Sequence, residues 1–172
     1  MVRFYYVKGC YKRGANRMQD INYIKGDATA PISSGEKIIC HICNDLGGWG
    51  KGFVLAISKR WKEPEMEYRK WHREKNNFSL GEVQFVKVEK YITIANMLGQ
   101  RGIKTGSKGV PIRYDAVEKC LEKVYLKAKE LGASVHMPRI GCGLAGGKWE
   151  KIEPLIVKSL IANDIEVFVY DF

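Results

Sequence analysis

The sequence predicts a single α/β domain in which helices cover both faces of a largely buried, mixed sheet. Strand-like and helix-like segments alternate along the chain, most clearly in its second half. Residues 36–43, EKIICHIC, are apolar almost throughout, as in a strand that is buried on both faces. The length of 172 residues fits one domain and leaves little room for a second. Alternation of this kind is typical of a sheet with a helix layer on each side.

The first half is expected to contain two strands, a glycine-rich loop and two helices. The strand INYIKGDAT ends in a turn, where glycine supplies backbone freedom and aspartate favours a cap. A proline in the first turn supports the second helix. In chain order these elements are the strand 21–29, the strand 36–43, the loop 44–52, the helix 53–61 and the helix 63–75.

The second half is expected to begin with a hairpin and to continue as alternating helices and strands. Residues 80–88 alternate apolar and polar side chains, and 90–98 follow after a tight connection. A long polar loop with four glycines, 99–111, comes next, and such loops are often functional or mobile. The remaining elements are an amphipathic helix 113–132 closed by Gly132, a strand 134–138, a helix 149–164 and a strand 165–172.

Composition favours a cytoplasmic globular protein, with 45% apolar and 28% charged residues. The chain has no apolar stretch of about 18 residues that would cross a membrane, and no secretory signal is evident. Five cysteines, an odd number, are expected to be mostly reduced. Cys40 and Cys43 have a C-x-x-C spacing, but no second pair exists and the two point to opposite faces of a strand. We therefore expect no metal and no cofactor.

The first 17 residues are expected to form a basic extension, and residues 18–172 to form the domain. The extension holds five basic residues and no acid, half of the net charge of +10. The extension is either a solubilising tail or an arm that binds nucleic acid. In the second case its aromatic side chains would stack on bases, and the cations Arg101, Lys104 and Lys108 of the later loop would contribute to binding. The rest of the chain is also mildly basic, which suits an anionic ligand.

Two glycine-rich loops, 44–52 and 141–147, each follow an apolar strand and precede a helix. Glycine lets backbone N–H groups approach an anion, and a helix N-terminus adds a positive dipole end. Residues 141–146 match G-x-G-x-x-G, yet a Rossmann site needs this motif in the first βαβ unit, with an acid roughly 20 residues on. Asp171 is the nominal acid, but no second mononucleotide-binding half follows it. We expect a diphosphate cradle of another kind.

Four segments resemble those of the macrodomain family: YIKGDAT, CNDLGGWGKGFVLAISKRW, MPRIGCGLAGGKWEKIEPLI and VFVYDF. The resemblance covers about residues 21–172 and is to the branch that processes ADP-ribose-1″-phosphate or removes terminal ADP-ribose. It implies a three-layer α/β/α sandwich that binds ADP-ribose at the strand ends. The implied partners are ADP-ribose or a derivative, or an ADP-ribosylated protein or nucleic acid, with no membrane partner.

The resemblance also assigns parts of the ligand to parts of the chain. Asp27 would accept a hydrogen bond from the adenine amino group, or else only cap a turn. The loop 44–52 would wrap the distal ribose and one phosphate, and 140–147 would give backbone N–H groups to the diphosphate. The predicted ligand-binding residues are Gly26, Asp27, Ala28, Asn44, Leu46, Trp49, Gly50, Gly52, Phe53, Pro138, Ile140, Gly141, Cys142, Gly143, Leu144, Ala145 and Gly146.

The implied chemistry is hydrolysis of a phosphate or of an acyl or ADP-ribosyl ester at the distal ribose. The glycohydrolase members use a lysine and an aspartate where this chain has Asn96 and Ala145, which argues against their mechanism. GLAGG is closer to the phosphatase-like members. The predicted catalytic residues are Asn44, which would orient the ribose, Asp45, which would position or deprotonate water, and Lys51, which would offset phosphate charge. The alternative is a reader that binds without turnover.

Several of these residues have a plain structural alternative. The alternative for Asp45 is a solvated loop residue or a loop cap, that for Lys51 and Lys148 is a solvated cation, and that for His41 is a core histidine. Trp49 either covers the ligand or packs in the core, and Trp149 favours packing. A further hypothesis is a Cys142 thiolate with His136 as its base.

Overall fold

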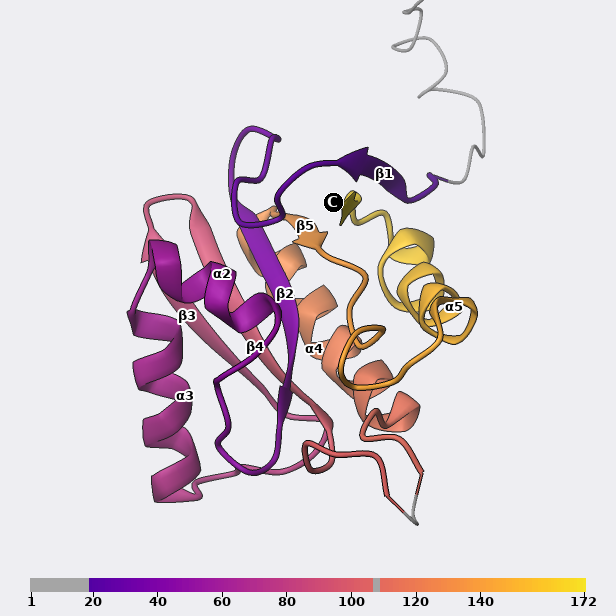
Figure 1. The fold of residues 1–172 in the computed structure, drawn as a ribbon. Helices are drawn as coiled ribbons and strands as arrows, with labels where there is room; N and C mark the ends of the chain where they lie inside the picture. Colours follow the sequence, from indigo (N-terminus) through magenta and orange to yellow (C-terminus); the bar gives the residue numbers. More distant parts are fainter. Residues whose placement is uncertain (1–18, 107–108) are drawn as a thin grey trace, which may run out of the picture.

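The structure is a computed structural model that describes residues 19–106 and 109–172, and it confirms the three-layer α/β/α sandwich (Figure 1). The basic segment 1–17 and Lys108 lie outside the described residues, so the predictions made for them are not addressed. The strands are β1 (Asn22–Lys25), β2 (Lys37–Asn44), β3 (Val83–Glu89), β4 (Ile92–Gln100), β5 (Ser134–Met137) and β6 (Val167–Asp171). The helices are α2 (Phe53–Arg60), α3 (Glu63–Glu74), α4 (Tyr114–Leu131), α5 (Trp149–Ser159) and the 3₁₀ helix η2 (Ile161–Asn163).

The six strands form one mixed sheet in the order β1-β6-β5-β2-β4-β3. Every neighbouring pair is parallel except β3 and β4, which form the antiparallel hairpin predicted from the sequence. β2 lies inside the sheet and is buried almost throughout, as its continuous apolar run predicts.

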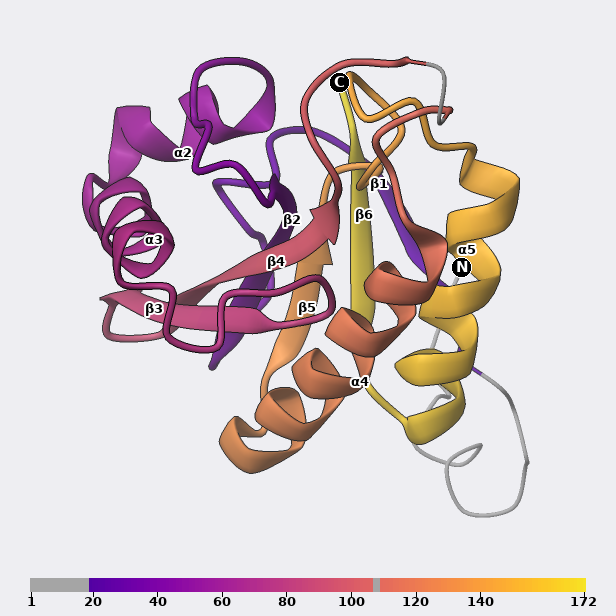
Figure 2. The ribbon, with the colours of Figure 1, turned by 90° about the horizontal axis from the view of Figure 1, so that it is seen from below.

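Strand alternation divides the core between the two faces of the sheet. Ile38 and Cys40 of β2 pack into a cluster with α4 and α5, whereas Ile39 and Cys43 pack into a cluster with α2 and α3. Figures 1 and 2 show α2 and α3 on one side of the sheet and α4 and α5 on the other. The two cysteines of the C-x-x-C spacing therefore point to opposite faces, and the described residues contain no cluster that could hold a metal ion.

One helix is shorter than its pattern indicates. The apolar periodicity predicts a helix over 149–164, but α5 ends at Ser159 and a 3₁₀ turn follows. The side chain of Asn163 donates to the carbonyls of Lys158 and Ser159, and Asp164 adopts a left-handed φ of 62°. These side-chain bonds and the left-handed residue end the helix and turn the chain into β6.

The parallel strands place the functional loops at one edge of the sheet. β1, β6, β5, β2 and β4 all end there, because they run in the same direction. The two glycine-rich loops follow β2 and β5, and a register shift between Cys43 and Asn44 marks the start of the first. Ligands of open α/β sheets bind at this edge. None of the helices in the described part has the length and apolar character needed to span a bilayer.

Candidate ligand-binding cleft

A cleft made of two adjoining hollows lies between the two glycine-rich loops. The smaller has a volume of about 260 Å³ and the larger about 590 Å³. Residues that line both include Lys51 from the first loop, Gln100 from the end of β4 and Leu144 from the second loop. The hollows are therefore continuous, and an elongated ligand can occupy both.

Asn44 holds the first loop in shape. Its Oδ1 accepts the backbone N–H groups of Leu46 and Gly48 at 2.9 and 3.0 Å, and its Nδ2 donates to the Gly48 carbonyl at 2.9 Å. The Tyr68 hydroxyl donates to the Asn44 carbonyl at 2.6 Å. Gly47 has φ 77°, and a Cβ there would lie 2.5 Å from the His72 ring. Asn44 lines the larger hollow, but its amide is already used by its own loop.

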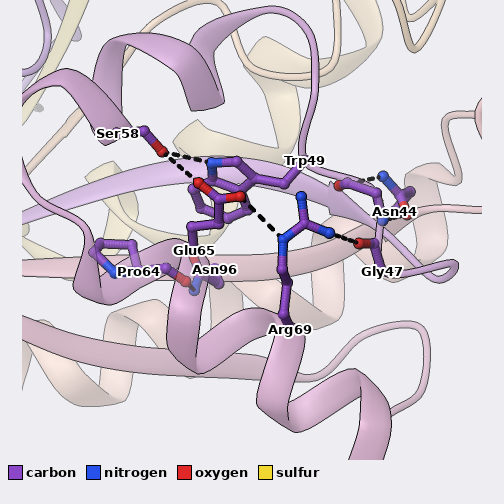
Figure 3. A network of polar contacts seen from close by, with 9 residues as sticks. Asn44, Gly47, Trp49, Ser58, Pro64, Glu65, Arg69 and Asn96 are labelled. Carbon is purple, nitrogen blue, oxygen red and sulfur yellow. Dashed lines mark hydrogen bonds and ion pairs between the residues drawn. The ribbon is translucent and has the colours of Figure 1, made fainter.

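Side chains of helices α2 and α3 hold the same loop in place (Figure 3). Trp49 Nε1 donates to Ser58 Oγ at 2.8 Å, and Ser58 donates to Glu65 at 3.0 Å. Arg69 donates to Glu65 and to the Gly47 carbonyl. Trp49 is 4% exposed and stacks edge-on with His41, so it packs in the core, and it also lines the larger hollow.

The glycines of the second loop fall into two kinds. Gly141 has φ 72°, and a Cβ would lie 2.7 Å from Ile112, while a Cβ at Gly147 would lie 2.4 Å from the Gly141 carbonyl. The fold therefore requires glycine at both positions. Gly143 differs, because its φ is not left-handed and a Cβ would meet no atom within 4 Å. Gly143 lines the smaller hollow, so the missing side chain leaves space there.

Both loops present backbone N–H groups to the cleft. Among the described residues, no hydrogen bond is found for the N–H groups of Gly143, Leu144 and Ala145, or of Gly50, Lys51, Gly52 and Phe53. The last of these begin α2, so the positive end of a helix dipole adds to them. Unpaired N–H groups from two loops around one cleft form an anion-binding site.

The side chains of the cleft carry the same sign of charge. Arg139 and Lys51 line the smaller hollow, and Lys51, Arg69 and Lys104 line the larger. Among the described residues, no aspartate or glutamate lines either hollow. The cleft therefore favours an anionic ligand. The predicted site did not include Arg69, Gln100 or Arg139; the position of Arg139 inside the PRIGCG motif was the available signal.

The structure brings most predicted site residues into the cleft and leaves others outside it. Those lining a hollow are Asn44, Trp49, Gly50, Lys51, Gly52, Phe53, Pro138, Ile140, Gly141, Gly143, Leu144 and Ala145. Those lining neither are Gly26, Asp27, Ala28, Asp45, Leu46, Cys142 and Gly146. Asp45 Oδ1 accepts the Gly102 N–H at 2.8 Å, which is the loop-capping alternative.

Asp27 lies further along the same edge, beyond β6. Its Oδ1 accepts the Thr29 N–H and hydroxyl, each at 2.8 Å, and Arg60 lies 3.5 Å from Oδ2. Burial alone would raise the pKa of Asp27, but the hydrogen bonds from Thr29 and Arg60 outweigh it and lower that pKa. Nearby, the Gly26 N–H donates to the Asp171 carbonyl. Phe172, which follows Asp171 in the chain, has a side chain that is 95% exposed.

The buried titratable groups near the cleft are not set up for acid–base chemistry. His41 Nε2 contacts Asn96 Oδ1 at 2.5 Å, and burial lowers the pKa of His41 to about 4. Asn96 also donates to the Pro64 carbonyl at 3.1 Å, so it is a buried structural amide (Figure 3). Burial raises the pKa of the Cys142 thiol, which disfavours a thiolate. His41 fits the description of a core histidine.

The family model of the Macro domain matches residues 40–156, so the chain belongs to the macrodomain family. The chain is 32% identical over 165 residues to the Chromodomain-helicase-DNA-binding protein 1-like of Mus musculus, covering 88% of this chain and 18% of that protein. It therefore spans less than a fifth of that much longer relative. It is also 29% identical to an ADP-ribose 1″-phosphate phosphatase of Candida albicans, covering 77% of this chain and 89% of that protein.

Solved structures agree with the family. A Bacteroides thetaiotaomicron protein of unknown function is 62% identical, with a TM-score of 0.89, covering 91% of this chain and 100% of that one. A Streptomyces coelicolor macrodomain protein is 55% identical, with a TM-score of 0.81, covering 89% and 99%. Thermosipho africanus DarTG in complex with ADP-ribose is 20% identical, with a TM-score of 0.71, covering 88% and 41%. This last likeness concerns the fold alone.

Proposed function

We propose that the protein binds ADP-ribose, free or attached to a macromolecule, in the cleft between its two glycine-rich loops. The observation that carries this is that, within the described part of the chain, the backbone N–H groups of residues 50–53 and 143–145 have no hydrogen-bond partner. Both sets face a cleft that is lined by cations. A diphosphate matches two such sets. Membership of the macrodomain family supports the assignment, as does a structural neighbour described in complex with ADP-ribose.

The sheet order suggests how the ligand lies. Asp27 and the exposed Phe172 follow β1 and β6, at one end of the edge, and would take the adenine. The diphosphate would lie over Gly143 in the smaller hollow. The distal ribose would enter the larger hollow beside the loop that Asn44 holds, so Asn44 acts there by shaping the loop.

Hydrolysis at the distal ribose is the second candidate function. It is favoured by relatives described as ADP-ribose 1″-phosphate phosphatases, of which this chain covers 89% in one case and 99% in another. Lys51 lines both hollows and would offset the charge of a terminal phosphate. Among the described residues, no aspartate or glutamate lines either hollow, so a carboxylate base would have to come from outside the lining. Asp45 could take that role only by breaking its hydrogen bond with the Gly102 N–H. Binding is therefore the function that the geometry supports best.

Calorimetric titration tests the proposal. ADP-ribose is expected to bind with micromolar affinity, more tightly than ADP, because only ADP-ribose fills the larger hollow. NAD serves as a control with a second base attached to the distal ribose. Absence of heat with millimolar ADP-ribose would refute the proposal. Phosphate release from ADP-ribose-1″-phosphate, compared between the wild type and Asp45→Asn, then separates the hydrolase from the reader: turnover that Asp45→Asn abolishes while binding persists indicates a hydrolase.

A further inference from the structure

Arg139 is held rigidly at the start of the second glycine-rich loop. Its Nε and Nη2 donate to the two carboxylate oxygens of Asp171 at 2.6 and 2.9 Å. Its Cζ lies 5.0 Å from the ring centroid of Tyr23 and 5.0 Å from that of Trp149. Trp149 Nε1 in turn donates to the Tyr23 hydroxyl at 2.9 Å. Residues from β1, β6 and α5 therefore fix one guanidinium group.

One nitrogen of the guanidinium group is available for a ligand. Among the described residues, no acceptor is found for Nη1 of Arg139, although Nε and Nη2 are both bonded. Arg139 also lines the smaller hollow, beside Gly141 and Gly143. A guanidinium that is already oriented loses little freedom when it donates to a ligand, and its planar donors suit phosphate oxygens.

The position of Arg139 along the sheet edge indicates which phosphate it meets. The strands end in the order β1, β6, β5 and β2, which carry Asp27, Asp171, Arg139 and Asn44 respectively at or just after their ends. Arg139 therefore lies between the proposed adenine end and the N–H groups of the second loop. If the adenine lies at Asp27, the phosphate bonded to adenosine lies closer to Arg139 than the second phosphate does.

We propose that Arg139 donates through Nη1 to the phosphate bonded directly to adenosine, while Asp171, Tyr23 and Trp149 hold the guanidinium in place. This rests on the proposed function and on its ligand orientation. Arg139 is thus a specificity-determining residue that recognises the proximal phosphate. It recognises neither the base nor the distal ribose.

A ligand series locates the contact. Adenosine, AMP, ADP and ADP-ribose are titrated into the wild type, Arg139→Met and Arg139→Lys. In Arg139→Met the affinity for the three phosphate-bearing ligands falls about tenfold, as expected for a partly exposed charged hydrogen bond, and adenosine is unaffected. Arg139→Lys recovers part of the lost affinity, because lysine keeps the positive charge but lacks the planar set of guanidinium donors. Lys148, an exposed cation just after the loop, lines neither hollow and serves as the control. Lys148→Met should change each affinity by no more than about twofold.

Asp171→Asn supplies a second, milder variant in case Arg139→Met unfolds. It keeps the Arg139 charge and loosens its hold, so a smaller loss confined to the phosphate-bearing ligands is expected. An equal loss for adenosine, or a loss that first appears between AMP and ADP, would overturn the assignment of the proximal phosphate. If the wild type binds ADP-ribose and Arg139→Met binds it equally well, this inference alone is overturned. A wild type that binds no ADP-ribose would overturn the proposed function with it.

Discussion

Gly143→Ala separates what the fold needs from what the ligand needs. A Cβ at Gly143 would meet no protein atom within 4 Å, and the backbone there is not left-handed. Folding stability is therefore expected to stay within about 0.5 kcal/mol, or to rise slightly as the unfolded chain loses freedom. The new methyl group, however, stands in the smaller hollow, beside N–H groups that need close approach to the ligand.

Overpacking a filled site costs about 1–3 kcal/mol, so the affinity for ADP-ribose should fall about 5- to 150-fold. Calorimetry gives the affinity and thermal unfolding gives the stability. Gly106→Ala is the matched control, since its Cβ also meets no atom within 4 Å and it lines neither hollow. Gly141→Ala should instead destabilise the fold by about 1–2 kcal/mol, because its φ of 72° is left-handed. Unchanged ADP-ribose affinity in Gly143→Ala would refute the path of the diphosphate over this loop.

Three further predictions concern stability and the adenine end. Burial lowers the pKa of both His41 and His136 to about 4 in the folded protein, whereas an unfolded histidine has a pKa of about 6.5. Between these two values the unfolded chain binds more protons than the folded protein, so the free energy of unfolding should fall by about 2 kcal/mol per histidine between pH 7 and about pH 5. Urea unfolding at both pH values checks this, and an unchanged midpoint contradicts it. Asn44→Ala should destabilise the protein by about 1–3 kcal/mol, because loop N–H groups lose their acceptor, and a thermal midpoint equal to the wild type would argue against that role. Phe172→Ala should weaken adenosine and ADP-ribose alike, roughly tenfold through lost stacking, with unchanged stability; a loss for ADP-ribose alone would place the base elsewhere.

The sequence predicted the parts of the fold that depend on local pattern. Period-two and period-3.6 apolar patterns located the strands and the helices, and glycine-rich segments after apolar strands located both walls of the cleft. The end of α5 was missed, because it depends on the Asn163 side-chain bonds and on the left-handed Asp164, which the apolar pattern of 149–164 does not contain.

Contacts between distant segments were beyond the reach of sequence patterns. A loop cap at Asp45 was one of the predicted alternatives, but its partner, the Gly102 N–H, depends on how β2 and β4 lie together. The contacts that hold Arg139 depend on β1 and β6 being neighbours. Trp49 shows the same limit: its place in a polar loop left open whether it covers the ligand or packs in the core, and the partners that bury it, Ser58 of α2 and Tyr68 of α3, come from elsewhere in the chain. The residues that line the cleft from α3 and β4, Arg69 and Gln100, were missed for this reason.

Amide chemical shifts of the ¹⁵N-labelled protein, followed during titration with ADP-ribose, test the central claim most directly. The account predicts the largest changes at the unpaired N–H groups of residues 50–53 and 143–145, with smaller changes near Asp27 and Phe172. ADP should reproduce the changes at 143–145 and produce weaker ones beside the larger hollow. Changes that leave both glycine-rich loops unaffected, or that gather on α4 and α5 instead, would contradict the account.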